Sequence, residues 1–224
     1  MVTTSPLDTP LPPAPPQFRP NVLAPAALRT LARLARDWLR RGIRRSDAIG
    51  TELRRIDPLV DQARATGTPA VPTHHPVVRH LAPALDGFRG LEPLAQVGML
   101  LPWRHADSGD ASGAASRDQL ARAELIGPEA PLLHPDFSLG FLLMAPHADH
   151  PAPVRPATEL HHIVSGRAFW TVGETTVERR SGDFILHPSD RRKAIRTADE
   201  PLLTIYTLTR NRATPLLLVP GASA

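Results

Sequence analysis

The C-terminal half of this sequence is a succession of short, mostly apolar segments that end at glycine or proline. The first ends at Gly127-Pro128, and later ones end at Gly166, Gly173 and Gly182. Short strands with turn residues between them are typical of all-β barrels and jelly rolls. We predict strands over 121–126, 137–144, 159–164, 168–172, 175–180, 184–187, 193–197 and 202–209, with candidate strands at 99–103 and, as an edge strand, at 216–219.

The N-terminal half has a helical pattern instead. Leu28, Leu31, Ala35 and Trp38 recur near the 3.6-residue period, which predicts a helix over 24–47. A second helix is expected over 46–65, interrupted at Pro58, with further helical segments over 77–97. The predicted fold class is α+β with a predominantly β C-terminal half. We divide the chain into a disordered proline-rich arm (1–23), a helical region (24–98) and a β-barrel (99–220), since proline fixes φ and removes an amide donor.

Composition excludes some classes of site and partner. The chain has no cysteine, so it can form neither a disulfide framework nor a thiolate metal site. The first thirty residues lack a basic segment followed by an apolar one, and no run of 18 apolar residues exists. We therefore expect a cytoplasmic protein with no membrane partner.

The basic residues are almost all arginine, and Lys193 is the sole lysine. Nucleic-acid binders combine a basic face with interleaved aromatic residues. Aromatic residues make up only 4% of this chain, so we expect a solvated helix face and no nucleic-acid partner. The same helices offer a surface for a homodimer. The densest basic cluster contains Arg36, Arg40, Arg41, Arg44 and Arg45.

Four residues keep a recognisable spacing within the predicted strands. Glu159 is followed after six residues by Gly166, and Gly182 is followed after five residues by Pro188. This spacing resembles that of the two cupin motifs, which implies a small double-stranded β-barrel. Over about residues 95–210 the chain resembles more specifically the cupin dimethylsulfoniopropionate (DMSP) lyases, through Ile126-Gly127-Pro128, Leu139-Gly140-Phe141, His150-Pro151, Pro156-Ala157, Val164-Ser165-Gly166, Trp170, His187-Pro188-Ser189, Glu200-Pro201-Leu202-Leu203 and Tyr206.

The resemblance implies a reaction and a set of site positions. Members of this family cleave DMSP to dimethyl sulfide and acrylate by β-elimination, with a divalent transition metal held by histidines and a glutamate. The tyrosine that acts as base falls on His161 here, and an earlier family tyrosine falls on His150. The family's metal ligands fall on Pro153, Arg155, Glu159 and Lys193.

At three of those four positions this chain has a residue that cannot serve as the family's metal ligand. Proline offers no side-chain lone pair, and arginine and lysine are cations that repel a metal ion. Glu159 and His161 lie two apart on a strand, so they face the same side. We predict no metal at the family position and leave the cofactor unknown. A metal site rebuilt around His150, His147 or His187 stays open as an alternative.

Two interpretations account for the cations. In the first, the site has decayed, and Glu159 forms an internal salt bridge with Arg155 or Lys193. In the second, Arg155 and Lys193 bind the carboxylate of a small ligand, and His161 with Glu159 supplies acid–base chemistry. A Schiff base at Lys193 is a further variant of the second interpretation.

Tyr206 and His150 are predicted to line the same pocket, as substrate-binding residues. The chain is then a divergent DMSP lyase or a non-catalytic cupin that binds a small carboxylate. An interaction protein that works through its N-terminal helices is the third hypothesis.

Overall fold

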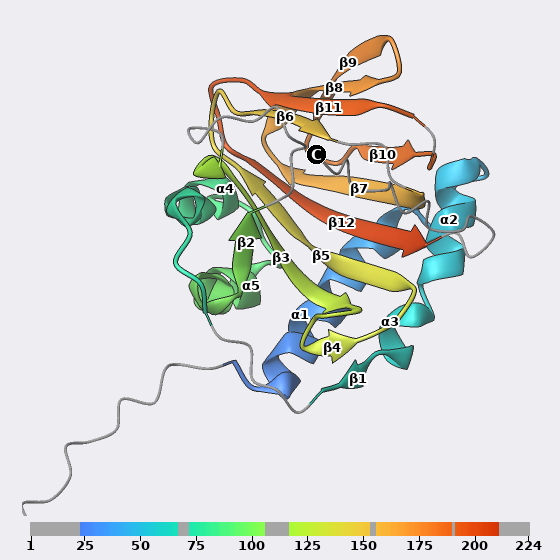
Figure 1. The fold of residues 1–224 in the computed structure, drawn as a ribbon, viewed down its shortest axis with the longest axis vertical. Coiled ribbons are helices and arrows are strands. Elements are labelled where there is room, and N and C mark those ends of the chain that lie inside the picture. Colours follow the sequence, from blue (N-terminus) through green and yellow to red (C-terminus); the bar gives the residue numbers. More distant parts are fainter. Residues whose placement is uncertain (1–22, 67–71, 106–116, 153–155, 190, 211–224) are drawn as a thin grey trace, which may run out of the picture.

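The computed structural model describes residues 23–66, 72–105, 117–152, 156–189 and 191–210 (Figure 1). Helices occupy the first part of this range and strands the second, as the sequence predicts. The helices are α1 (Pro25–Leu39), α2 (Ala48–Ile56), α3 (Leu59–Gln62), α4 (Leu81–Leu85) and α5 (Glu92–Val97), with 3-10 turns η1 (Arg40–Gly42), η2 (Pro76–His80) and η3 (Gly98–Leu100).

The strands form two sheets that face each other as in a jelly roll, without one closed ladder among the described residues. The larger sheet has the order β1-β4-β3-β5-β12-β7-β10, with β2 paired to β3, and the smaller has the order β6-β11-β8-β9. The strands are β1 (Arg64–Ala65), β2 (Trp103–His105), β3 (Leu120–Gly127), β4 (Leu132–Leu133), β5 (Phe137–Met144), β6 (Asp149–Ala152), β7 (Ala157–Ser165), β8 (Arg167–Val172), β9 (Thr175–Arg180), β10 (Phe184–His187), β11 (Lys193–Thr197) and β12 (Leu202–Arg210).

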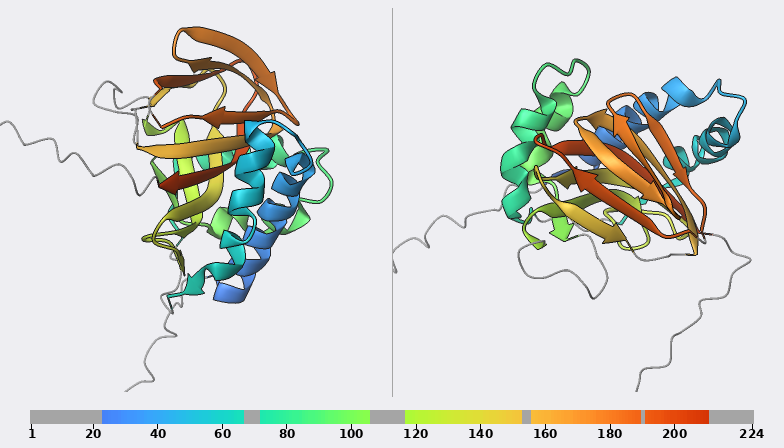
Figure 2. Two further views of the ribbon diagram at one scale, coloured as in Figure 1. Left: turned by 90° about the vertical axis from the view of Figure 1, so that its right-hand side faces the viewer. Right: turned by 90° about the horizontal axis from the view of Figure 1, so that it is seen from above.

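The outer face of the larger sheet carries the helices. Pro25 starts α1, where its missing amide costs nothing, and α1 turns Leu28, Leu31 and Trp38 towards the sheet, where all three are buried. Figure 2 shows α1 and α2 side by side against this face. A continuous apolar cluster joins the helices to Leu160 and Val164 of β7. None of the described helices combines the length and the apolar character needed to span a lipid bilayer.

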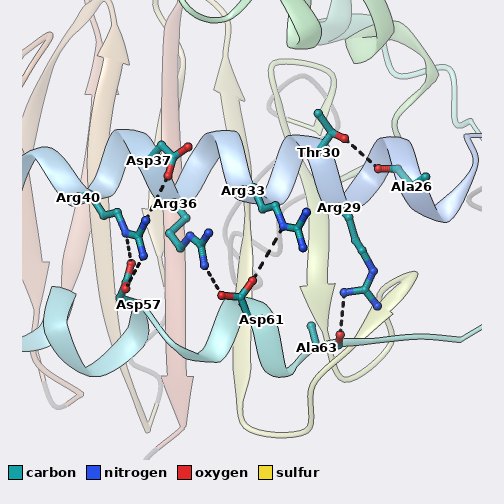
Figure 3. A network of polar contacts seen from close by, with 10 residues as sticks. All are labelled: Ala26, Arg29, Thr30, Arg33, Arg36, Asp37, Arg40, Asp57, Asp61 and Ala63. Atoms are coloured by element: carbon teal, nitrogen blue, oxygen red, sulfur yellow. Dashed lines mark hydrogen bonds and ion pairs between the residues drawn. The ribbon is translucent and has the colours of Figure 1, made fainter.

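Arginines of α1 and of the turn η1 bind the segment that follows them. Figure 3 shows Arg36 and Arg40 reaching Asp61 and Asp57 on α3 and at the end of α2. Arg40 makes two hydrogen bonds to Asp57, of 2.6 and 2.9 Å. Arg45 pairs with Asp47 at 2.6 Å and Arg41 lies over the Trp38 ring, so at least four of the five arginines of the basic cluster are engaged within the chain.

The inner faces of the two sheets enclose a second apolar cluster. It includes Ile163 of β7, Trp170 of β8, Ile195 of β11 and Tyr206 of β12. Because side chains alternate along a strand, Glu159 and His161 share the inner face with Ile163. His162 lies on the outer face, where its ring stacks on Phe184 with centroids 4.2 Å apart.

The same backbone requirement explains why glycine occupies both positions of the sequence motif. Gly166 has φ 82° and Gly182 has φ 93°, values in the left-handed region that residues with a Cβ rarely adopt. A Cβ at Gly166 would also come within 2.2 Å of the carbonyl oxygen of Pro201. The motif spacing therefore marks two tight turns of the jelly roll.

The candidate strand over 99–103 is wrong in its first part. Residues Gly98–Leu100 form the turn η3, and the strand is β2, which begins at Trp103. The indole N–H of Trp103 donates to the carbonyl of Gly98 at 2.8 Å, so the apolar run is folded back on itself. The strands β1, β4 and β6 were also not predicted from the sequence. The predicted arm and the candidate strand at 216–219 lie outside the described residues, except for Leu23.

Candidate functional site

Glu159 lies at the centre of a buried group of charged and polar side chains inside the jelly roll. It is only 2% exposed. Its Oε2 accepts from the ammonium group of Lys193, and its Oε1 lies 3.2 Å from the guanidinium of Arg122 and 2.9 Å from Nε2 of His161. A buried carboxylate needs such partners, because its charge has lost the solvation of water.

Lys193 reaches this position from the smaller sheet. It starts β11, pairs in register with Val172 of β8, and its side chain is 5% exposed. The predicted salt bridge between Glu159 and Lys193 is therefore present. Arg155 and Pro153 lie outside the described residues, so the predicted carboxylate clamp by Arg155 stays a prediction.

His161 is neutral, and both of its ring nitrogens are engaged. Burial, together with the nearby Arg122 cation, holds the pKa of His161 well below 6.5. Since Glu159 is an acceptor, Nε2–H of His161 donates to it, and Nδ1 accepts from the hydroxyl of Thr204 at 3.1 Å. The lone pair that a base needs therefore points at Thr204 in this arrangement.

Two other histidines, His150 and His187, are also buried in the interior, whereas His147 is exposed. His187 accepts at Nε2 from the indole N–H of Trp170, and its ring centroid is 6.0 Å from that of His161. Burial lowers the pKa of His187 to about 3. His150, on β6, is fully buried opposite Ile195 of β11. His147 lies in the preceding turn with φ 56°.

The residues at the family's metal position do not fit a metal ion. Glu159 already carries the Lys193 ammonium on one oxygen and two further donors on the other. Within the described ranges, no group of three or more histidine, aspartate or glutamate side chains is arranged to hold a metal. No group of this kind forms from the described His147, His150 and His187, the residues named for a rebuilt site.

A cavity of about 220 Å³ opens beside this group, between β2, β3 and β12. Tyr206 lines it, whereas His150, which was expected to share a pocket with Tyr206, is not part of the lining. The guanidinium of Arg122 also lines it and lies over the Tyr206 ring, 5.0 Å from the ring centroid. The lining consists of Pro102, Arg104, His105, Arg122, Glu124, Glu129, Ala130, Pro131, Tyr206 and Leu208.

Arg122 joins the cavity to the buried carboxylate. One of its terminal N–H groups donates to Glu159, while its buried Nε–H has no acceptor among the described residues. An arginine N–H left without a partner in a buried place costs free energy, and an anionic ligand would satisfy it.

Sequence reasoning missed both Arg122 and Glu124. They alternate with apolar residues on β3 and both face the cavity. Charged residues at every second position of an apolar strand were the available signal, since they mark one polar face. Which interior group they would meet depends on the pairing of β3 with β5 and of β5 with β12.

The facing sheets, the motif glycines and the interior glutamate define a cupin. Residues 51–204, more than half of the chain, match the family model of dimethylsulfoniopropionate lyases. This protein therefore belongs to the DMSP lyase family.

Individual relatives agree with this assignment. The DMSP lyase DddQ of Ruegeria pomeroyi is 29% identical over 109 residues, which cover 48% of this chain and 54% of that protein. The match thus spans about half the length of the curated relative. The crystal structure of DddQ from Ruegeria pomeroyi DSS-3 has a TM-score of 0.67 at 22% identity, covering 88% of this chain and 99% of that one. A structure from a study of the DMSP lyases RdDddP and RnDddQII has a TM-score of 0.66 at 24% identity, covering 82% and 92%. These structural similarities establish the fold.

Proposed function

We propose that this protein binds a small carboxylate of the DMSP class in the cavity between β2, β3 and β12. The observation that carries the proposal is the position of Arg122, which lines the cavity and keeps a buried N–H without an acceptor. Guanidinium groups are suited to carboxylates because their N–H donors match the two oxygens.

Charge balance supports an anionic ligand. The buried group contains one carboxylate, Glu159, and two cations, Lys193 and Arg122, while His161 is neutral. Lys193 and Glu159 offset each other, so Arg122 adds a positive charge to this buried group, and that charge is partly offset by Glu124 of the cavity lining. Arg104 adds a second guanidinium to the cavity lining.

The cavity also suits the rest of a zwitterion such as DMSP. Drug-sized ligands occupy pockets of about 300–1,000 Å³, and this cavity, at about 220 Å³, is suited to a smaller molecule. Glu129 in the lining supplies negative charge for a cationic end. Membership of the DMSP lyase family makes DMSP the first ligand to test.

The family's carbon–sulfur β-elimination is a second candidate function. It is favoured by a specific observation: the cavity is lined by a half-buried carboxylate, Glu124, 3.5 Å from the hydroxyl of Tyr206. Elimination requires a group that takes the proton next to the substrate carboxylate. The fixed tautomer of His161 makes it a poorer candidate in the described arrangement.

Binding is tested by titration calorimetry with DMSP and propionate, and with choline as a cation that lacks a carboxylate. We expect both carboxylates to bind and choline not to bind. Arg122→Met keeps the aliphatic stem and removes the donors, so it should weaken binding at least tenfold. Arg64→Met, at an exposed arginine of β1, is the matched control, and circular dichroism checks that each variant is folded. Equal affinity of wild type and Arg122→Met for DMSP, or no binding by the wild type, would refute the proposal.

A further inference from the structure

Glu124 has surroundings that an ordinary surface carboxylate lacks. It lines the cavity, and its Oε2 lies 3.5 Å from the Tyr206 hydroxyl. Burial raises the pKa of Glu124 above 4.5, against the opposing effects of Ser138, Arg122 and Tyr206. A carboxylate with a raised pKa is closer to the range in which acid–base groups work at neutral pH.

The backbone of β3 is shaped around this side chain. The register between β3 and β5 shifts between Glu124 and Ile126, and such irregularities re-aim a side chain next to functional sites. The shift lets Leu125 and Ile126 both join the apolar cluster between the larger sheet and the helices, while Glu124 keeps its place at the cavity.

Gly127 and Gly140 leave room for the side chains of Glu124 and Tyr206. A Cβ at Gly127 would come within 1.8 Å of Oε1 of Glu124. A Cβ at Gly140 would come within 2.3 Å of the carbonyl oxygen of Ala123, and within 3.0 Å of both the Cα of Glu124 and Cε1 of Tyr206. A larger residue at position 127 would displace the carboxylate, and one at position 140 would displace the backbone of β3 beside Glu124.

From this geometry we propose that Glu124 is the proton acceptor of the cavity and that Tyr206 positions its carboxylate. The inference rests on the proposed ligand. In the reaction, Glu124 takes the proton next to the DMSP carboxylate, and the electron pair of that C–H bond forms the C=C bond of acrylate. The carbon–sulfur bond breaks, and its electron pair leaves on neutral dimethyl sulfide. Glu124 then returns its proton to water.

The first test compares binding and turnover in Glu124→Gln. The glutamine keeps the shape and loses the base, so DMSP should still bind in calorimetry, while dimethyl sulfide release falls about 10²–10⁴-fold. Glu178→Gln, at an exposed glutamate of β9, is the matched control and should release dimethyl sulfide at the wild-type rate.

The second test uses the pH dependence of the rate. The wild-type rate should rise with pH through the raised pKa of Glu124. Tyr206→Phe keeps the ring and removes the hydroxyl, whose hydrogen bond lowers that pKa, so the rising limb should move to higher pH. A merely structural role of Tyr206 would leave the limb in place.

Different results would overturn the proposed function and the inference about Glu124. A wild-type protein that binds no DMSP removes the proposed function. A wild-type protein that binds DMSP, but neither releases dimethyl sulfide nor exchanges the ligand's carbon-bound protons in D₂O, overturns the inference about Glu124 and leaves binding intact. Wild-type turnover in Glu124→Gln overturns it as well.

Discussion

The ammonium group of Lys193 contacts Oε2 of Glu159 in the interior of the jelly roll, where the side chains are 5% and 3% exposed. The two residues come from different sheets, β11 and β7. The ion pair is therefore a link across the interior as well as a feature of the site.

Removing the lysine should destabilise the fold. Lys193→Met leaves Glu159 with Arg122 and His161 alone, and losing one partner of a buried pair costs about 3–5 kcal/mol. Urea denaturation measures the loss. The double variant Lys193→Met/Glu159→Gln removes both charges and should recover most of the stability. Equal destabilisation in the single and double variants would show that the pair is not coupled.

Restoring the family's ligands should restore metal uptake. Elemental analysis of the wild-type protein is expected to find no stoichiometric transition metal, because the ammonium of Lys193 holds the Glu159 oxygen that a metal would use. The triple variant Pro153→His/Arg155→His/Lys193→His supplies imidazoles at the positions implied by the family, and should take up zinc or nickel near one equivalent. Stoichiometric metal in the wild type would contradict the first expectation.

His162 should make the stability of the folded protein depend on pH. Burial lowers the pKa of His162 from 6.5 to about 4. The hydrogen bond that its Nδ1–H donates to the carbonyl of Asp183 opposes this shift, and Arg41 adds to it. The unfolded chain then binds a proton that the folded chain does not, so stability is complete above about pH 6.5 and falls as the pH drops towards 4. The loss is about 3 kcal/mol.

The corresponding variant is His162→Phe, which keeps a ring on Phe184. Its unfolding free energy, measured by urea denaturation from pH 7 to 4, should fall less steeply than that of the wild type. A residual slope remains from His187, whose pKa is also lowered. Parallel curves for the two proteins would argue against a neutral His162 in the folded state.

The ion pair between Arg40 and Asp57 should contribute little to the stability of the fold. Asp57→Asn removes the partner of Arg40, and exposed pairs are worth about 0.2–1 kcal/mol. The cost should shrink further at 1 M salt, because the pair is partly open to solvent. A thermal melt at two salt concentrations measures it, and a loss that is large and independent of salt would mean that the pair is not a surface contact.

The order of elements and the inner face of β7 followed from local patterns. The periodicity of Leu28 and Trp38 predicted α1, and the two-residue spacing of Glu159 and His161 put both on one face. The turns at Gly166 and Gly182 were also predictable, because their backbone conformation restricts the residue type.

The partners of Glu159 were harder to predict. Lys193 could be named because the motif spacing aligned it with Glu159. Arg122 and Glu124 come from a strand 35 or more residues earlier, and only the pairing order of β3, β5, β12 and β7 brings them to the cavity. Long-range strand pairing is not encoded in any short stretch of sequence, so this half of the site required the fold.

The burial of Lys193 has a practical consequence for labelling. As the sole lysine of the chain, it carries the one side-chain amine, and that amine is closed off in the folded protein. Acylating reagents should modify it only when β7 and β11 separate, so the rate of its modification reports how often the interior opens.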